Sequence, residues 1–289
     1  MKNKPNTQSE SHQLPPRSAH PPALQGSRRK SISGFFALIA LLSLMCCSNA
    51  LAWTLVWSDE FTASTIDTTK WGFDLGAGGW GNGELQTYTS TNAYIQNGEL
   101  VIKAVKTGPT SYTSSRLKTQ DKASWKYGKI QIRAKLPYSQ GLWPAFWMLG
   151  TNYPSVGWPY CGEIDIMELR GGGVGFDDTI YGTLHWWDEV GNHGASYGSS
   201  YTLPTPQFFY QAYHVFEIEW NATDMIWRLD GVQWFTTSIN TNLWPTMEEF
   251  QKPFSMIMNV AVGGNWPGRP NPSTVWPQYM YVDYVRVYQ

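Results

Sequence analysis

Alternation of apolar and polar residues after residue 52 is the feature that most constrains what this chain can fold into. Successive side chains of a β-strand point to opposite faces, so apolar residues at every second position are typical of half-buried strands. Asp230-Gly231 separates two such segments and is a hairpin turn signal. The expected strands cover residues 99–106, 129–136, 214–220, 225–229, 232–235 and 279–288.

Helical periodicity is missing from every long segment after residue 52, so we predict an all-β fold. Alternation with turn residues between segments favours antiparallel sheets, and hence a sandwich or β-jelly roll of two such sheets. Long connections rich in Gly and aromatic residues are expected to form loops, and six of them suggest a deep cleft. These loops cover residues 76–83, 138–143, 150–160, 171–176, 187–205 and 263–277.

The N-terminal segment, residues 1–52, is expected to be separate from the fold. Residues 1–30 are rich in Pro, Ser and basic residues, which predicts disorder, and an apolar run ends at Ala50-Leu51-Ala52. A basic flank, an apolar run and an Ala-x-Ala end are the parts of an export signal. We therefore expect one domain at residues 53–289, secreted to the outside or the periplasm, without stable membrane association after cleavage. The alternative is an uncleaved anchor, although the run is shorter than the roughly 20 residues of a membrane span.

The charge balance argues against nucleic acid as a partner. The chain has 21 basic and 22 acidic residues, and residues 1–52 hold six of the basic ones and one of the acidic ones. The remainder therefore has 15 and 21, a net charge of about −6, and an acidic domain repels phosphate backbones. Cys161 is the single cysteine after residue 52, so we expect a buried thiol and no internal disulfide.

Aromatic residues are unusually common, with 16 Trp and 16 Tyr against 15% charged residues. Sugars present flat C–H faces that pack on aromatic rings, so this composition is consistent with carbohydrate recognition. The competing interpretation is a Trp-rich core, which we expect for Trp220, Trp227 and Trp234 because they fall on expected strands. Trp158 and Trp266 lie in loops, where a binding role is more natural.

Residues 162–169, Gly-Glu-Ile-Asp-Ile-Met-Glu-Leu, concentrate three acids on one expected strand. Glu163 and Asp165 share a face, and simple alternation would bury Glu168 beside the core, which is costly for an unpaired carboxylate. One extra residue at Met167, a β-bulge, would return Glu168 to the acidic face.

Three carboxylates on one strand face repel one another, and a fold tolerates this mainly when the charges are used by a metal or by acid–base chemistry. Glycoside hydrolysis with retention needs a nucleophilic carboxylate and a carboxylic acid, and a third acid can raise the pKa of the proton donor. A solvated acidic face and a calcium site are the alternatives that spacing leaves open.

Residues 162–168 resemble the signature of glycoside hydrolase family 16, in the form with an extra residue before the last Glu that is typical of its laminarinase-type branch. The resemblance extends over essentially the whole chain after residue 52. Further matching motifs lie at residues 57–61, 82–88, 115–119, 141–149, 263–268 and 282–288.

The resemblance implies a β-jelly roll with a concave substrate cleft, and an endo-β-1,3-glucanase that acts with retention on laminarin-like polysaccharide as a monomer. Its motif makes Glu163 the nucleophile, Asp165 the assisting acid and Glu168 the general acid/base, with no cofactor for catalysis. The expected cleft residues are Asn82, Arg116, Trp143, Trp147, Trp158, His185, Asn265 and Trp266. Trp143 is expected to stack on sugar and His185 to make a polar contact near the leaving group. Some members hold a structural calcium ion, at positions that match Glu60, Gly98 and Asp283.

Two departures leave the substrate open. Many relatives have Asn where this chain has Gly83, and Trp186-Trp187 adds bulk after His185. A mixed-linkage β-1,3-1,4-glucanase, a galactan hydrolase and a transglycosylase remain alternatives, because loops decide specificity. A non-catalytic glycan-binding protein of the same fold is disfavoured, because all three acids are present.

Two other patterns carry little weight. Residues 194–198 match the Gly-x-Ser-x-Gly elbow of hydrolases, but we expect a loop there without the following helix that the elbow needs. His185, His193 and His214 lack the close spacing of a catalytic zinc site.

Overall fold

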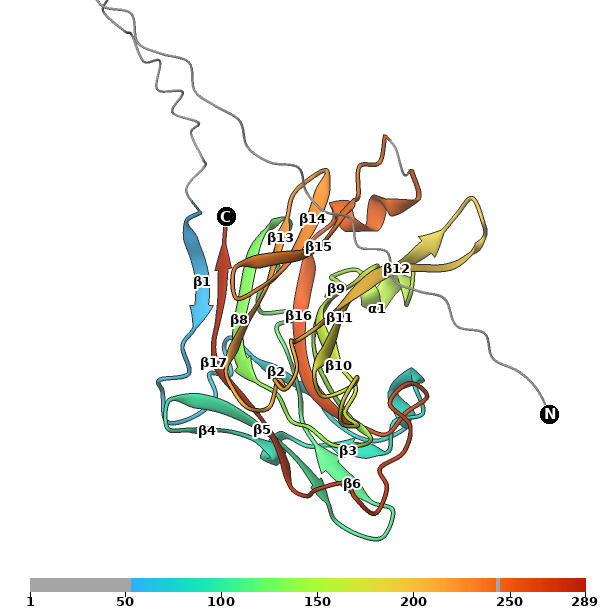
Figure 1. The fold of residues 1–289 in the computed structure, drawn as a ribbon. Coiled ribbons are helices and arrows are strands. Elements are labelled where there is room, and N and C mark those ends of the chain that lie inside the picture. Colours follow the sequence, from blue (N-terminus) through green and yellow to red (C-terminus); the bar gives the residue numbers. More distant parts are fainter. Residues whose placement is uncertain (1–52, 243–244) are drawn as a thin grey trace, which may run out of the picture. The chain divides into compact units, whose positions relative to one another are not determined.

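Two β-sheets packed face to face make up the fold in the computed structural model, which describes residues 53–242 and 245–289 (Figure 1). The expected export signal, residues 1–52, lies outside the described residues. Among the described residues, no helix is both long and apolar enough to cross a membrane. The predicted all-β sandwich of antiparallel sheets is confirmed, and one short parallel pairing, between β3 and β6, is the exception.

The first sheet has ten strands, and its main path begins with the hairpin that Asp230-Gly231 closes. The path runs in the order β15 (Val232–Ser238), β14 (Asp224–Leu229), β13 (His214–Trp220), β8 (Gly128–Lys135), β17 (Gln278–Tyr288), β5 (Glu99–Lys106), β6 (Tyr112–Ser114) and β3 (Gln86–Tyr88). Beside it, β1 (Leu55–Asp59) pairs with β17, and β4 (Ala93–Gln96) pairs with β5. All six strands expected from alternation lie in this sheet, within a few residues of the expected bounds.

The second sheet has seven strands and carries the functional residues described below. Its order is β12 (His193–Thr202), β11 (Thr179–Asp188), β10 (Glu163–Leu169), β9 (Leu142–Gly150), β16 (Phe254–Val262), β7 (Arg116–Lys118) and β2 (Gly72–Asp74). Helical segments are short: α1 (Tyr153–Val156) and the 3-10 turns Gly79–Gly81, Ser90–Asn92 and Pro245–Gln251.

The expected loop at residues 187–205 is wrong. Ten residues of β12 pair with β11 in continuous register, and the connection between them is only four residues, 189–192. Gly and Ser dominate β12, and these residues have low strand propensity, so pairing with β11 rather than local sequence determines the strand. The expected loops at 138–143 and 150–160 are partly wrong as well, since β9 begins at Leu142 and α1 lies within the second loop.

The hydrophobic core lies between the sheets and holds the apolar faces of their strands. Trp220 and Trp227 are fully buried there, as expected, while Trp234 is partly buried at its margin. The indole Nε1 of Trp227 donates a hydrogen bond of 2.9 Å to the backbone carbonyl oxygen of Asp165, which ties β14 to β10 across the core.

Candidate active site

A β-bulge in β10 aligns the three acids. Asp165 pairs with Thr183 and Glu168 with Tyr181 on the neighbouring strand, so Ile166 and Met167 together stand opposite Gly182. Both of these apolar side chains are buried in the core. The bulge predicted from the sequence is therefore confirmed, and Glu163, Asp165 and Glu168 all reach one cleft.

The cleft has a volume of about 790 Å³ and lies over the outer face of the seven-stranded sheet. Alternate residues of six adjacent strands form its floor, from Asp74 on β2 to His185 on β11. Seven of the eight expected binding residues line it: Asn82, Arg116, Trp143, Trp147, Trp158, His185 and Trp266. Asn265 does not line it; its backbone N–H donates to the Asn82 carbonyl oxygen at 2.7 Å and joins two loops at the rim.

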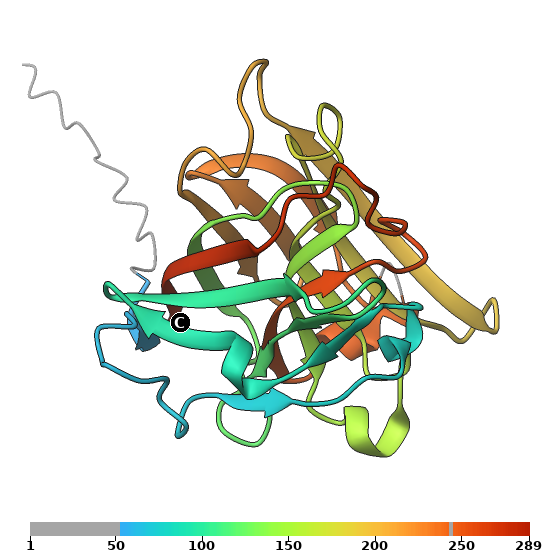
Figure 2. The ribbon, with the colours of Figure 1, turned by 90° about the horizontal axis from the view of Figure 1, so that it is seen from below.

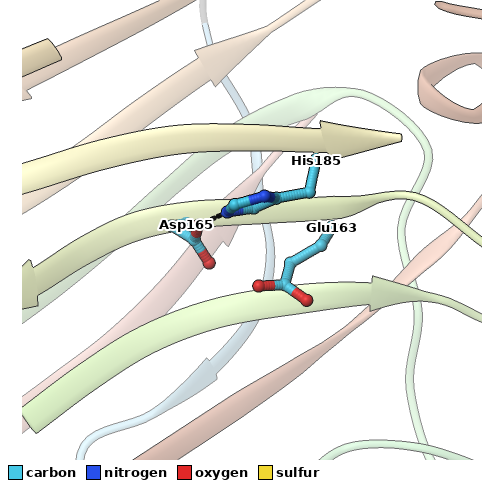
Figure 3. Close-up of side chains that lie close together, drawn as sticks. All are labelled: Glu163, Asp165 and His185. Atoms are coloured by element: carbon cyan, nitrogen blue, oxygen red, sulfur yellow. Dashed lines mark ion pairs between the residues drawn. The ribbon is translucent and has the colours of Figure 1, made fainter. Parts of the chain in front are cut away.

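Glu163, Asp165 and His185 lie side by side on the neighbouring strands β10 and β11 of the floor (Figure 3). The Nε2 of His185 is 3.1 Å from Oδ2 of Asp165, and one donor atom from each of the three side chains lies within 4.8 Å of the others. Such a group offers ligands to a divalent cation as well as acid–base chemistry. The same positions also suit a nucleophile with an assisting acid, which needs no ion.

Glu168 occupies the other end of the acidic row. The indole Nε1 of Trp143 donates a hydrogen bond of 2.9 Å to its Oε1, which leaves Oε2 available to hold a proton. Trp143 and Tyr181 both pack edge-on against Trp266, with ring centroids 5.4 and 4.9 Å away, and these rings form the wall beside Glu168.

Burial and mutual repulsion raise the pKa of every acid in the row. Burial and then the charge of Asp165 raise the pKa of Glu163 to about 8. Burial and then the charge of Glu163 raise the pKa of Glu168 to about 7, against the lowering effect of the Trp143 hydrogen bond. The pKa of Asp165 is also raised, by burial and the charge of Glu168. The row therefore retains protons near neutral pH, as a general acid requires.

The far end of the cleft is charged. Asp74 forms ion pairs with Arg116, at 3.0 Å, and with Lys118, at 2.6 Å. The guanidinium of Arg116 lies between two indoles, 4.6 Å from the ring centre of Trp147 and 5.0 Å from that of Trp80. Arg116 is thus held from three sides in a fixed position, which suits hydrogen bonding to sugar hydroxyls.

Several lining residues were not expected from the sequence. Asn259 and Glu84 line the cleft, and a chain of hydrogen bonds through the buried Tyr88 connects them: the indole of Trp147 donates to Asn259, Asn259 to Tyr88, and Tyr88 to Glu84. Other unexpected lining residues are Asp74, Trp80, Lys118, Gln120, Tyr153, Tyr181 and Thr183. Strand parity would have found Tyr181 and Thr183, because both share a face of the 179–188 strand with His185.

A family model described as glycosyl hydrolases family 16 matches residues 82–286. The chain belongs to glycosyl hydrolase family 16. The fold agrees with that family: the laminarinase catalytic domain of Thermotoga maritima MSB8 superposes with a TM-score of 0.75 at 45% identity, over 82% of this chain and 98% of that one.

Two curated relatives of this family 16 chain have named activities or roles. The β-glucanase of Rhodothermus marinus is 42% identical over 82% of this chain and 85% of its own length. The clotting factor G alpha subunit of Tachypleus tridentatus is 41% identical over 85% of this chain, but only 35% of its own length. The chain therefore spans nearly all of some relatives and about a third of others.

The expected calcium residues lie away from the cleft, on the ten-stranded sheet of this family 16 fold. Along one edge of β17, the partner changes from β5, at Val282, to β1, at Val285. Gly98 ends the turn before β5, Glu60 follows β1, and Asp283 lies at a register shift between those two pairings. The topology thus brings the three positions to one place. Glu60 pairs there with Arg286, at 2.8 Å, and Asp283 with Arg133.

Neither residues 194–198 nor Cys161 contributes a nucleophile to the site. Residues 194–198 lie within β12 rather than in a loop, and the next element after that strand is the strand β13, so they are not the strand-to-helix turn of a nucleophile elbow. Cys161 is fully buried, as expected, and burial raises the pKa of its thiol to about 12. An inert thiol follows, because the reactive thiolate is not formed near neutral pH.

The raised pKa values predict how Glu168 affects stability with pH. Where the pKa of a carboxyl group is higher in the folded state than in the unfolded state, the stability of the fold decreases as pH rises through the folded-state pKa. We therefore expect Glu168→Gln to stabilise the fold more at pH 8 than at pH 4, by roughly 1–3 kcal/mol. Denaturant unfolding of the variant and the unsubstituted protein at both pH values measures this difference.

The exposed Glu248 offers the matched control, since Glu248→Gln removes a carboxylate outside the cleft. Its effect should be small and nearly the same at both pH values. An equal effect of Glu168→Gln at pH 4 and pH 8 would contradict a burial-raised pKa at the active site.

Proposed function

We propose that this chain is a secreted, retaining endo-β-1,3-glucanase of laminarinase type that works through a glycosyl-Glu163 intermediate. The observation that carries the proposal is the row of Glu163, Asp165 and Glu168 on one bulged strand at the floor of a long cleft. Family membership and the laminarinase and β-glucanase names of its relatives support the substrate class.

In the first step, the Glu163 carboxylate attacks the anomeric carbon while Glu168 donates its proton to the glycosidic oxygen. The bond to the leaving sugar breaks and an ester to Glu163 forms. In the second step, Glu168 removes a proton from water, which attacks the same carbon and releases Glu163. Both steps invert the anomeric centre, so the overall configuration is retained.

Asp165 and Trp143 prepare the two glutamates for these roles. In this proposal a proton lies between the hydrogen-bonded carboxyl groups of Asp165 and Glu163, and it rests on Asp165 when the Glu163 carboxylate attacks. Trp143 fixes one oxygen of Glu168, so the proton on the other oxygen is directed at the substrate. Two protons shared among three buried acids also limit the repulsion in the row.

Loop residues determine the linkage, so mixed-linkage β-1,3-1,4-glucan and transfer to a second sugar are the alternative outcomes. Reducing-sugar release from laminarin, lichenan, agarose and xylan, assayed side by side, separates the polymers. Transfer is recognised by products longer than the substrate.

We further propose that Glu60, Gly98 and Asp283 hold a structural calcium ion. Two carboxylates and a backbone carbonyl are oxygen donors of the kind that calcium prefers, and the sheet topology supports their approach. An ion there would compete with Arg286 and Arg133 for the carboxylates. Its role would be to join β1, β5 and β17 at the edge where the pairing partner changes.

The roles of the two glutamates are tested by replacement and chemical rescue. We expect Glu163→Ala and Glu168→Ala each to lower kcat on laminarin by about a thousandfold or more, since each removes a reacting group. With azide and an activated aryl β-glycoside, Glu163→Ala should give an α-glycosyl azide and Glu168→Ala a β-glycosyl azide. NMR of the products distinguishes the two.

Glu219→Gln is the matched control, because Glu219 pairs with Arg228 on the ten-stranded sheet. It should keep full activity. Activity should also survive EDTA, since the reaction uses no metal at Glu163, Asp165 and His185. Near wild-type turnover by Glu163→Ala, or the same azide anomer from both variants, would refute the assigned roles.

For the calcium site, we expect calcium to raise the thermal midpoint of the protein by several degrees over its value in EDTA, because a ligand of the folded state stabilises it. Asp283→Asn should abolish the difference. Differential scanning calorimetry with calcium, magnesium and EDTA measures it. An unchanged midpoint, or an equal response in the variant, would remove the proposed site.

Export is tested by mass spectrometry of protein recovered from outside the cytoplasm of an expressing cell. Cleavage after Ala52 should leave Trp53 as the first residue, and size-exclusion chromatography should give a monomer. Recovery of the uncleaved chain in the membrane fraction would favour the anchor.

A further inference from the structure

Two aromatic rings, that of the exposed Tyr160 and that of the half-buried Trp187, lie just outside the cleft, at its β11 end. Tyr181, Thr183 and His185 line the cleft from alternate positions of β11, and Trp187 is the next residue of the same parity. Tyr160 lies in the segment before β10, with 45% of its surface exposed. The rings of Tyr160 and Trp187 are stacked, with centroids 4.6 Å apart and planes at 29°.

This ring pair continues the aromatic lining of the active site. Trp158 lines the cleft with 54% of its surface exposed, and its ring centre is 6.1 Å from that of His185. Trp187 follows His185 by two strand positions, a step of about 7 Å along β11. The pair therefore stands roughly one sugar ring beyond the residues that line the cleft.

A projecting hairpin carries Trp187. In both views the yellow ribbons of β11 and β12 extend past the neighbouring strands of their sheet (Figures 1 and 2). Gly194 pairs with Trp187 across this hairpin, and a Cβ at Gly194 would lie 3.4 Å from the ring of Pro159. The hairpin thus closely approaches the segment that bears Tyr160, and this approach supports the two stacked rings.

The pair is not explained by core packing. Neither ring packs against the hydrophobic core, whereas Trp186, between His185 and Trp187, is buried in it. Neither the Trp187 indole N–H nor the Tyr160 hydroxyl forms a hydrogen bond within the described residues. Apolar ring faces with unused polar atoms at the edge match the surface of a sugar, which has C–H faces and hydroxyl rims.

We propose that Tyr160 and Trp187 form an accessory subsite that binds a glucosyl residue of a chain that leaves the cleft past His185, in the direction of Trp187 along β11. This inference rests on the proposed β-glucanase function. The subsite adds affinity for long chains and contributes nothing to the chemical step. Substrates too short to reach it are therefore cleaved independently of it.

Kinetics of Trp187→Ala on a long and a short substrate test the subsite. On laminarin we expect KM to rise about tenfold, the factor that 1.4 kcal/mol of binding corresponds to, with kcat unchanged. On an aryl laminaribioside, which has two sugars and so few contacts outside the catalytic positions, the change in KM should be much smaller. Trp187→Phe keeps a ring and should recover most of the affinity for laminarin.

Tyr197→Ala is the matched control, because Tyr197 is an aromatic residue of β12, 53% exposed, that packs against Phe235 rather than beside Tyr160. It should change neither substrate's kinetic constants. An unchanged KM of Trp187→Ala on laminarin, or equal losses on both substrates, would overturn the subsite. If the unsubstituted protein cleaves neither laminarin nor the bioside, the proposed function itself fails and the subsite falls with it.

Discussion

The bulge at Ile166 and Met167 is the constraint on which the active site depends. A regular strand could show only alternate residues to the cleft, and it would place Glu168 in the core. Because Ile166 and Met167 both stand opposite Gly182, the alternation of faces shifts by one residue at this point. Both apolar side chains stay buried, and Glu168 faces the cleft. The backbone carbonyl of Asp165, at the start of the bulge, accepts the Trp227 indole hydrogen bond. The opposite sheet thereby fixes the place where the catalytic strand changes register.

Repulsion within the acidic row is the cost of this arrangement and also the source of its chemistry. Acids that could ionise freely would be three anions at neutral pH, with no proton to give to a leaving group. Burial and proximity raise all three pKa values, so the row holds protons in the range where the enzyme needs a general acid. His185 beside Asp165 and Trp143 on Glu168 then make the positions unequal. Identical functional groups acquire different roles from their neighbours.

Much of this could be predicted from the sequence, where local pattern and structure agree. Five of the six alternating segments became strands with a buried face, and the sixth, β15, has no buried residue but pairs with β14 across the Asp230-Gly231 turn. The bulge followed from the cost of burying Glu168. β12 was missed because its Gly and Ser residues carry no apolar pattern, and only pairing with β11 determines it. β16 was missed because both of its faces are buried, which removes the alternation. Asp74 and Asn259 were missed because single polar residues gain meaning only from strands that approach across long sequence distances.

The two ends of the cleft offer different kinds of contact, charged hydrogen-bond donors at one end and aromatic rings at the other, and this difference affects how a polymer is bound. At the β2 end, Asp74 fixes Arg116 and Lys118, so the hydrogen-bond donors there are charged and held in place. Such donors orient sugar hydroxyls because hydrogen bonds are directional. At the β11 end, the rings of Trp158, Tyr160 and Trp187 offer apolar area, which attracts a sugar face with little regard to its rotation. Rigid polar contacts would fix which sugar of the chain lies over Glu163. Aromatic contacts would add affinity for longer chains without fixing that position. The proposed endo-acting function requires both kinds of contact, because one bond must be placed at the acids while chains of any length are accepted.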